Sequence, residues 1–188
     1  MGDRRHGRCV KALAALCVAA GETLAQESQP VARRLVMISI PDRKLALVED
    51  GRVVKIYPVA VGKAATPSPA GSFTVADRVQ HPTWYRPGRA VPPGRNNPLG
   101  PRWIGLSRRG YGIHGTNRPS SIGRSASHGC IRMRNVDVEQ LFALVEIGDP
   151  VELYAERTAD VARIFGAPFT RKAASNADTR AAAVPVRQ

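Results

Sequence analysis

Long hydrophobic runs are absent from this 188-residue chain, so we predict no transmembrane span. The apolar run at residues 12–20 is too short to cross a bilayer, and no later stretch is long enough. Basic residues precede this run, and small residues follow it at positions 23 and 25. This order is typical of a cleavable secretory signal, which we place at residues 1–25, before a short linker at residues 26–33.

Two other interpretations of the N-terminus stay open. An ordinary amphipathic helix is disfavoured because the segment is apolar all round and its charges lie at one end only. A lipid-attachment site at Cys17 is disfavoured because Leu16 is bulky where such a site has a small residue. We therefore predict export through a cleaved signal.

Cysteine is scarce, with three residues in the whole chain. Cleavage after Ala25 would remove Cys9 and Cys17 and leave Cys130 alone. A single cysteine in an exported protein forms an intermolecular bond or serves as a working thiol, because it has no internal partner. An inert buried cysteine is the alternative.

Acidic residues are missing from position 78 to position 136, a segment that holds eleven arginines. The formal charge of the chain is +13, and loss of four basic and two acidic residues with the signal would leave +11. Such a surface attracts anions. Nucleic acid is a poor candidate because no aromatic-basic RNA signature or recognition helix accompanies the charge. Carboxylate-rich cell-envelope material fits better, and a solvated basic face is the alternative.

The pattern of apolar residues predicts a mainly β domain. Strand-like runs occupy residues 35–40, 44–49, 53–61, 72–76, 103–106, 111–113 and 151–154. Asp50-Gly51 favours a tight hairpin, because a primed turn needs positive φ. Residues 79–101 are rich in Pro, Gly and Asn and predict a long loop that covers a cleft. Trp84 and Tyr85 in this loop are lid aromatics or core residues.

Only one segment predicts a clear helix. Apolar residues recur at i, i+3, i+4 and i+7 from Val138, Asn135 can cap the start, and Gly148 can end it. A second short helix fits residues 158–165. We therefore predict one domain over residues 34–155, a short helical extension over 156–169 and a disordered tail over 170–188.

The stretch from His114 to Cys130 concentrates the reactive side chains. A cysteine attacks as its thiolate, so a neighbouring base or positive charge must lower its ordinary pKa of about 8.5. A histidine within hydrogen-bond reach does this and later returns the proton to a leaving amine. The Gly/Ser-rich loop between His114 and Cys130 can bring them together. We predict Cys130 as nucleophile and His114 as base, with the Gly129 and Cys130 N–H groups as an oxyanion hole.

Three rival interpretations apply to the same residues. His114, His128 and Cys130 are candidate metal ligands, but their spacing is unlike that of zinc sites and no fourth ligand is evident. A redox thiol is weaker, because no resolving cysteine is left after export. His128 is also a candidate for a purely structural role within the loop.

The ordered motifs resemble the YkuD-type L,D-transpeptidases of bacterial cell walls. The resemblance rests on His114-Gly115, then Ser127-His128-Gly129-Cys130-Ile131-Arg132-Met133, with Asn135 and Asp137. It extends upstream through residues 66–73, 97–100 and 103–106 and downstream to 148–151, and so covers roughly residues 34–154. It implies a mainly β, sandwich-like catalytic domain with one main helix and long active-site loops.

The resemblance also implies roles for these residues. Cys130 is similar to the family's nucleophile and His114 to its proton donor and acceptor, with the Gly115 carbonyl orienting the imidazole. Ser127, His128 and Gly129 resemble the supporting site, and Arg132 lies where a substrate carboxylate would bind. Tyr111 and Trp84 are further candidates for substrate contact.

The implied substrate is the tetrapeptide stem of peptidoglycan. The thiolate would attack at the L-centre of the third residue, a diamino acid, and expel D-Ala. The thioester would then pass to a second stem and give a 3→3 cross-link in the periplasm, without metal or organic cofactor. Carbapenems are implied inhibitors. Three alternatives stay open. Water as the acceptor would make the protein a carboxypeptidase or endopeptidase, and a protein lysine as the acceptor would make it an anchoring enzyme. The third alternative is a non-catalytic envelope-binding protein.

Overall fold

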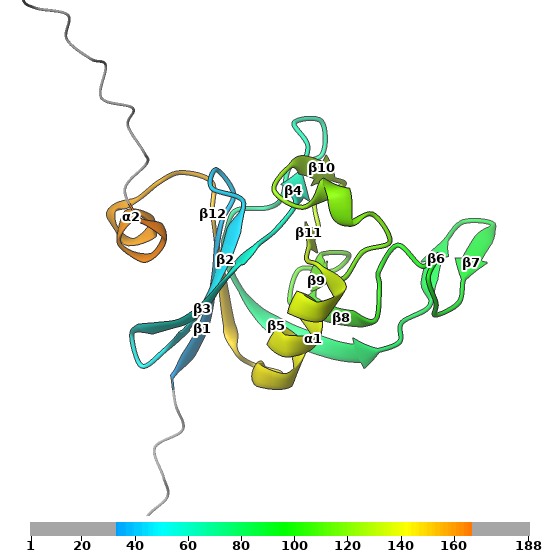
Figure 1. Cartoon of the computed structure of the whole chain (residues 1–188), viewed down its shortest axis with the longest axis horizontal. Coiled ribbons are helices and arrows are strands. Elements are labelled where there is room, and N and C mark those ends of the chain that lie inside the picture. Colours follow the sequence, from blue (N-terminus) through cyan, green and yellow to red (C-terminus); the bar gives the residue numbers. More distant parts are fainter. Residues whose placement is uncertain (1–32, 167–188) are drawn as a thin grey trace, which may run out of the picture. The chain divides into compact units, whose positions relative to one another are not determined.

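A computed structural model describes residues 33–166 of the chain (Figure 1). The predicted signal, nearly all of the predicted linker and the predicted tail lie outside the described residues, as do Cys9 and Cys17. No helix within residues 33–166 is long and apolar enough to cross a membrane.

Twelve strands, two α-helices and one short 3₁₀ turn make up this part of the chain. The strands are β1 Arg34–Ser39, β2 Lys44–Glu49, β3 Arg52–Pro58, β4 Val61–Gly62, β5 Gly71–Gln80, β6 Trp84–Arg86, β7 Arg89–Val91, β8 Arg102–Leu106, β9 Gly112–His114, β10 Ser125–Ser127, β11 Ile131–Arg132 and β12 Pro150–Tyr154. The helices are α1 Asn135–Leu144 and α2 Ala159–Phe165, and the 3₁₀ turn is Pro119–Ser121. The predicted mainly β class, with one main and one short helix, is confirmed.

Eight strands form one curled sheet in the order β11-β9-β8-β5-β12-β1-β2-β3. Most neighbours are antiparallel, but β11 pairs with β9 and β1 pairs with β12 in parallel. Two small sheets, β10 with β4 and β6 with β7, are attached to the large sheet. In Figure 1 the β6–β7 hairpin projects from the end of the molecule opposite α2.

The core divides into two parts because β1 and β2 are buried on both faces. On one face Val36 and Ile38 join the main core, which α1 completes with Val138, Leu141 and Phe142. On the other face Met37 packs in a smaller cluster with Val161 and Phe165 of α2. Thr158 caps α2 by accepting a hydrogen bond from the Val161 N–H. The alternate residues of one strand therefore hold two layers together.

The predicted hairpin at Asp50-Gly51 is confirmed. Both residues have positive φ, 48° and 76°, and they join β2 to β3. The predicted cap at Asn135 is wrong. Arg134 occupies the N-cap position of α1 and makes no side-chain cap bond. The Asn135 side chain instead accepts a hydrogen bond from the Thr116 N–H at 2.8 Å.

The prediction of an irregular loop over residues 79–101 is also wrong in part. β5 continues to Gln80, and β6 and β7 form a short hairpin with Trp84 opposite Val91. Its turn is Pro87-Gly88, with Gly88 at φ 71°. Proline followed by a residue with positive φ is the signature of a type II turn, so the sequence carried the signal.

Candidate active site

His114 and Cys130 project from the same face because β9 and β11 run parallel in one sheet. Ile131 pairs with Ile113, and both are buried in the main core. Side chains alternate along a strand, so Cys130 and Arg132 point away from that core. His114, the partner of Arg132, does the same. Residues sixteen positions apart are thereby brought to one surface of the sheet.

The imidazole of His114 is held by its neighbour. Its Nδ1 lies 2.6 Å from the Gly115 carbonyl oxygen. A carbonyl only accepts, so Nδ1 carries the proton and Nε2 offers a lone pair. Burial lowers the pKa of His114 to about 4; the charge of Arg132 also lowers it, while the Gly115 and Leu99 carbonyls oppose the shift. The ring is therefore neutral at pH 7.

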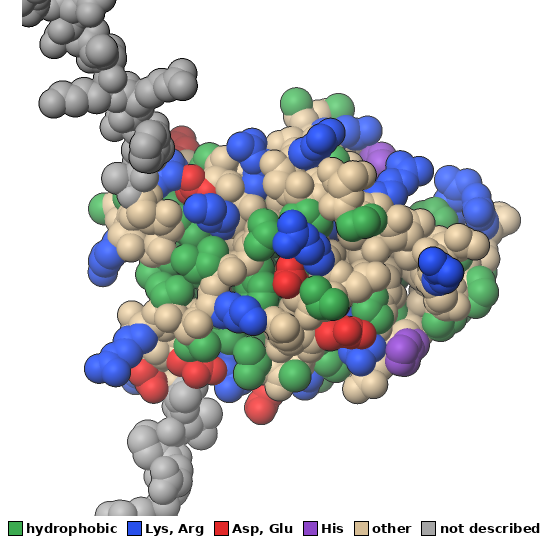
Figure 2. Space-filling model, viewed as in Figure 1, with side chains coloured by type: hydrophobic (Ala, Val, Ile, Leu, Met, Phe, Trp, Pro, Cys, Tyr) green, Lys and Arg blue, Asp and Glu red, His purple; other side chains and the backbone are tan. Residues whose placement is uncertain are grey.

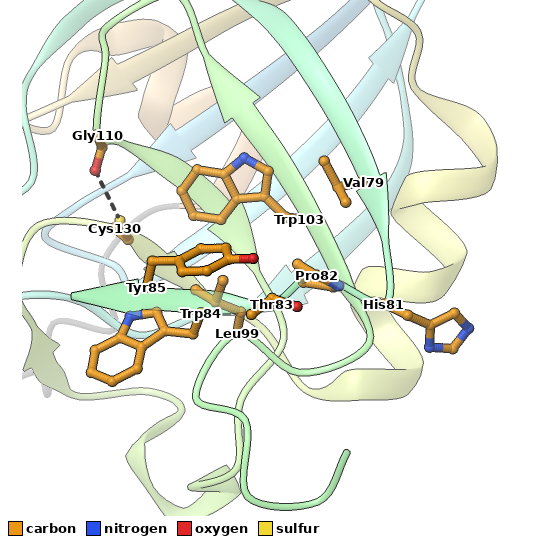
Figure 3. A pocket seen from close by; sticks show the side chains of 10 residues that line it. All are labelled: Val79, His81, Pro82, Thr83, Trp84, Tyr85, Leu99, Trp103, Gly110 and Cys130. Atoms are coloured by element: carbon orange, nitrogen blue, oxygen red, sulfur yellow. Dashed lines mark hydrogen bonds between the residues drawn. The ribbon is translucent and has the colours of Figure 1, made fainter. Parts of the chain in front are cut away.

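The thiol of Cys130 is also neutral at rest. Burial raises its pKa, and this outweighs the lowering by the Gly112 N–H and by the charge of Arg132. Its Sγ lies 3.6 Å from the Gly110 carbonyl oxygen, which accepts a hydrogen bond from the thiol (Figure 3). The sequence led us to expect a lowered thiol pKa; the net direction is the reverse, because desolvation dominates.

The turn before Cys130 is organised by Ser127. Its hydroxyl donates to the Cys130 carbonyl at 2.6 Å and accepts from the Gly129 N–H at 3.0 Å. The Gly129 N–H is therefore occupied in this conformation, unlike the free oxyanion donor expected from the sequence. His128 is exposed, and its ring has no hydrogen-bond partner within residues 33–166.

A pocket of about 690 Å³ opens beside the Cys130 side chain (Figure 3). The other lining residues are Val79, His81, Pro82, Thr83, Trp84, Tyr85, Leu99, Trp103 and Gly110. Trp84 and Tyr85 come from the β6–β7 hairpin, so this hairpin forms one wall over the cysteine. Tyr85 is 75% exposed, which excludes it from the core. His81 points away from the other lining side chains in Figure 3.

Tyr111, a predicted substrate contact, lies elsewhere. It packs against the main core and is not among the residues that line the pocket. A Cβ added at Gly129 would lie 2.7 Å from its ring, so the tyrosine packs against the turn before Cys130. Arg132 is half-buried and lines a second, smaller pocket.

Two residues that sequence reasoning did not assign to the site also position it. Trp103 stacks on His114 and lines the pocket beside Cys130. Asn135 holds the segment after His114 through Thr116, and a Cβ added at Gly115 would lie 2.5 Å from its Oδ1. The signals were present, since Trp103 lies in a predicted strand and Asn135 follows the cysteine motif. Within the described residues, no three His, Cys, Asp or Glu side chains gather closely enough to hold a metal ion.

Comparison with known proteins identifies the family. Residues 33–153 match the sequence profile of YkuD, the L,D-transpeptidase catalytic domain. This chain belongs to that family, as its motifs predicted. A putative L,D-transpeptidase YkuD from Bacillus licheniformis is 42% identical over 118 residues, which are 63% of this chain and 64% of that protein. The match thus spans less than two thirds of that relative.

Solved structures share the fold. An L,D-transpeptidase from Mycobacterium smegmatis superposes with a TM-score of 0.56 at 23% identity, covering 66% of this chain and 59% of the other. The transpeptidase LdtMt1 in complex with imipenem gives 0.55 at 23% identity, covering 65% and 59%. At this identity the likeness establishes the mainly β YkuD-type architecture.

Proposed function

We propose that this chain is an exported L,D-transpeptidase that acts on peptidoglycan stem peptides. It releases the terminal D-Ala and forms 3→3 cross-links through a thioester on Cys130. The parallel pairing of β9 and β11 carries this proposal: from it we infer that Cys130, just before β11, and the neutral His114 share one face, and Cys130 lines a pocket of about 690 Å³. Family membership supports the reaction class.

Acylation begins from a neutral pair. Sγ attacks the carbonyl carbon at the L-centre of the third residue as the thiol proton passes to His114 Nε2. The Gly115 carbonyl holds the Nδ1 proton and steadies the imidazolium that forms. The C–N bond to D-Ala then breaks, and the imidazolium returns its proton to the leaving amine. A thioester and free D-Ala result.

Transfer reverses these roles. The side-chain amine of a second stem attacks the thioester carbon and gives up a proton to Nε2. The C–S bond breaks, and the proton returns to the sulfur. The products are an amide between two third residues and the free enzyme, so no cofactor takes part in the proposed cycle.

The resting pKa values suit this sequence. A preformed thiolate–imidazolium pair would be costly in a buried site, since burial raises the pKa of Cys130 and lowers that of His114. Charge appears only as the S–C bond forms, when the oxyanion and the imidazolium arise together. The same chemistry would open a carbapenem ring, and the imipenem complex of LdtMt1 supports such inhibition.

Intact-protein mass spectrometry with a disaccharide-tetrapeptide tests the proposal. We expect an adduct on Cys130 with loss of D-Ala, followed by cross-linked dimers. Cys130→Ala should form no adduct while keeping the wild-type circular dichroism spectrum. Adducts that resolve only to tripeptide would identify a hydrolase or an enzyme with a protein acceptor. No adduct from a folded protein with a titratable thiol would favour an envelope-binding protein.

A further inference from the structure

A second pocket shares Trp84 with the pocket beside Cys130. Trp84 lines both, so the two pockets adjoin at this residue. This second pocket, the arginine pocket, has a volume of about 200 Å³. It is lined by Arg86, Arg89, Arg118 and Arg132 together with Trp84, Val91, Asn96, Pro98 and Asn117.

The four arginines reach this pocket from separate parts of the chain. Arg86 and Arg89 are cross-strand partners in the β6–β7 hairpin. Arg118 lies just before the 3₁₀ turn, and Arg132 lies on β11, two residues after Cys130. The Asn117 side chain donates to the Asn96 carbonyl at 3.1 Å and ties two walls together. Tertiary folding therefore brings together four arginine charges from separate segments of the sequence.

Among the described residues, no carboxylate lies close enough to neutralise these charges. Within residues 33–166 none of the four has an acidic partner within 4.0 Å, whereas Arg34, Arg102, Arg157 and Arg163 each have at least one. Arg118 repels Arg132: the pKa of Arg132 is lowered, chiefly by burial and next by the charge of Arg118. Figure 2 shows basic and no acidic side chains at the end of this face where Figure 1 places β6 and β7. Such convergence favours an anionic ligand.

The walls define the chemistry of that ligand. Guanidiniums bind carboxylates with paired, charge-assisted hydrogen bonds. Trp84 and Val91 add an apolar wall suited to methylene groups. The volume is comparable to that of a single amino-acid residue. An aliphatic side chain that ends in a carboxylate meets these conditions.

We propose that the arginine pocket binds the side-chain carboxylate of a diamino dicarboxylic acid at the third position of the acceptor stem. This inference rests on the proposed transpeptidase function. In such an acid the carboxylate and the attacking amine are on the same carbon. Binding the carboxylate beside Arg132 therefore brings the amine toward the thioester on Cys130. The positive charges also favour the neutral form of that amine, which is the form that attacks. The enzyme thus selects acceptor stems with a free carboxylate on the third residue over stems with a carboxamide there and over stems with lysine at that position.

A two-step experiment tests the proposal. Acyl-enzyme is first formed from one donor stem, and acceptor stems with a carboxylate, a carboxamide or lysine at the third residue are then added. We expect transfer to the carboxylate acceptor to be at least about 10-fold faster, since hydrogen bonds to charged groups are the strong ones. This ratio should fall as sodium chloride is raised from 50 to 500 mM. Equal transfer rates to the three acceptors, or a rate ratio that does not change with salt concentration, would overturn the proposal.

Variants locate the effect. Arg86→Gln/Arg89→Gln should bring the carboxylate-to-amide ratio close to one. Arg124→Gln, which removes an exposed arginine of the same acid-free segment outside the arginine pocket, should keep the wild-type ratio. Two outcomes would overturn the acceptor assignment. One is an unchanged carboxylate-to-amide ratio in the double variant, and the other is a carboxylate preference in the acylation step, where the stem is the donor.

A binding measurement separates this inference from the proposed reaction. If no acyl-enzyme forms with any stem, the transpeptidase proposal fails. Calorimetry of the Cys130→Ala protein with carboxylate and carboxamide stems then tests the arginine pocket directly. Tighter binding of the carboxylate stem, lost in Arg86→Gln/Arg89→Gln, supports the carboxylate site, and equal binding overturns it.

Discussion

The indole of Trp103 stacks on the imidazole of His114, with 5.8 Å between ring centroids and 24° between ring planes. The sheet sets this contact, because the two residues are cross-strand partners in β8 and β9. Gly112 leaves room for it, since an added Cβ would lie 2.6 Å from the indole. Trp103 therefore covers one face of the imidazole, which helps to exclude water from the ring and to fix its orientation.

Replacing Trp103 with leucine should slow acylation of Cys130 about 10-fold to 100-fold, because small misplacements of a catalytic group cost that much. Trp103→Phe keeps an aromatic surface over His114 and should recover most of the rate. Stopped-flow acylation by a carbapenem measures both variants. If Trp103→Leu reacts like wild type, the indole has no positioning role.

The acylation rate should depend on pH through His114. The ring must be neutral to accept the thiol proton, and burial lowers its pKa to about 4. We therefore expect a rate that is level from pH 7 to pH 5 and halves near pH 4. Single-turnover acylation over this range provides the test. A midpoint near 6.5, the ordinary pKa of histidine, would contradict a buried, neutral base.

Alkylation of Cys130 by iodoacetamide should follow a different profile. This reagent reacts with the thiolate, and burial raises the pKa of the thiol. The alkylation rate of the free protein should therefore rise with a midpoint at higher pH than the rate of a free cysteine peptide. Mass spectrometry measures both rates in parallel. A midpoint below that of the peptide would show that a thiolate is formed before substrate binds.

Stability should fall on acidification because His114 is buried in its neutral form. Between its folded pKa of about 4 and its unfolded pKa of 6.5, the unfolded chain binds more protons, so stability is lost as pH falls through this window. From pH 7 to pH 5 the loss is about 2 kcal/mol. Urea unfolding measures it, and His114→Gln should lack this component. An equal loss in both proteins would assign it to other groups.

Gly129→Ala should destabilise the turn before Cys130. Gly129 has φ 112°, and its added Cβ would lie 2.7 Å from the Tyr111 ring, so we expect a loss of about 1–3 kcal/mol and slower acylation. Gly123→Ala is a matched control: its φ is 83°, and nothing lies within 4 Å of the added Cβ. Equal losses in urea unfolding would show that backbone strain alone accounts for the effect.

The β6–β7 hairpin is anchored by Asn97. Its buried amide donates to the carbonyls of Pro82, Val91 and Pro92, and its oxygen accepts from the Leu99 N–H. Asn97→Ala leaves these buried groups without partners and should cost about 1–3 kcal/mol. The loosened hairpin should raise the KM for the donor stem more than it lowers kcat. Asn96→Ala, an exposed neighbour, should change stability little.

Local patterns predicted much of the fold. The Asp50-Gly51 turn, the main strands and the helix that includes Val138 depend on neighbouring residues, and the structure has them close to where they were expected. The helix ends at Leu144, however, and not at the predicted Gly148. The short β6–β7 hairpin was missed because its strands have three residues each, too few for a periodic signal. The role of Asn135 was missed because a capping residue and a residue that bonds a distant loop look alike in sequence.

The sequence by itself determined the family and predicts which residues react, because the spacing of His114, Ser127, His128 and Cys130 is a property of the chain. Tertiary structure decided the rest. Parallel pairing of β9 and β11 set the common face of His114 and Cys130, and strand neighbours placed Trp103 over the imidazole. Folding also gathered four arginines around one pocket that Trp84 helps to line. Burial reversed the expected direction of the thiol pKa, since desolvation depends on the whole surrounding structure rather than on adjacent residues.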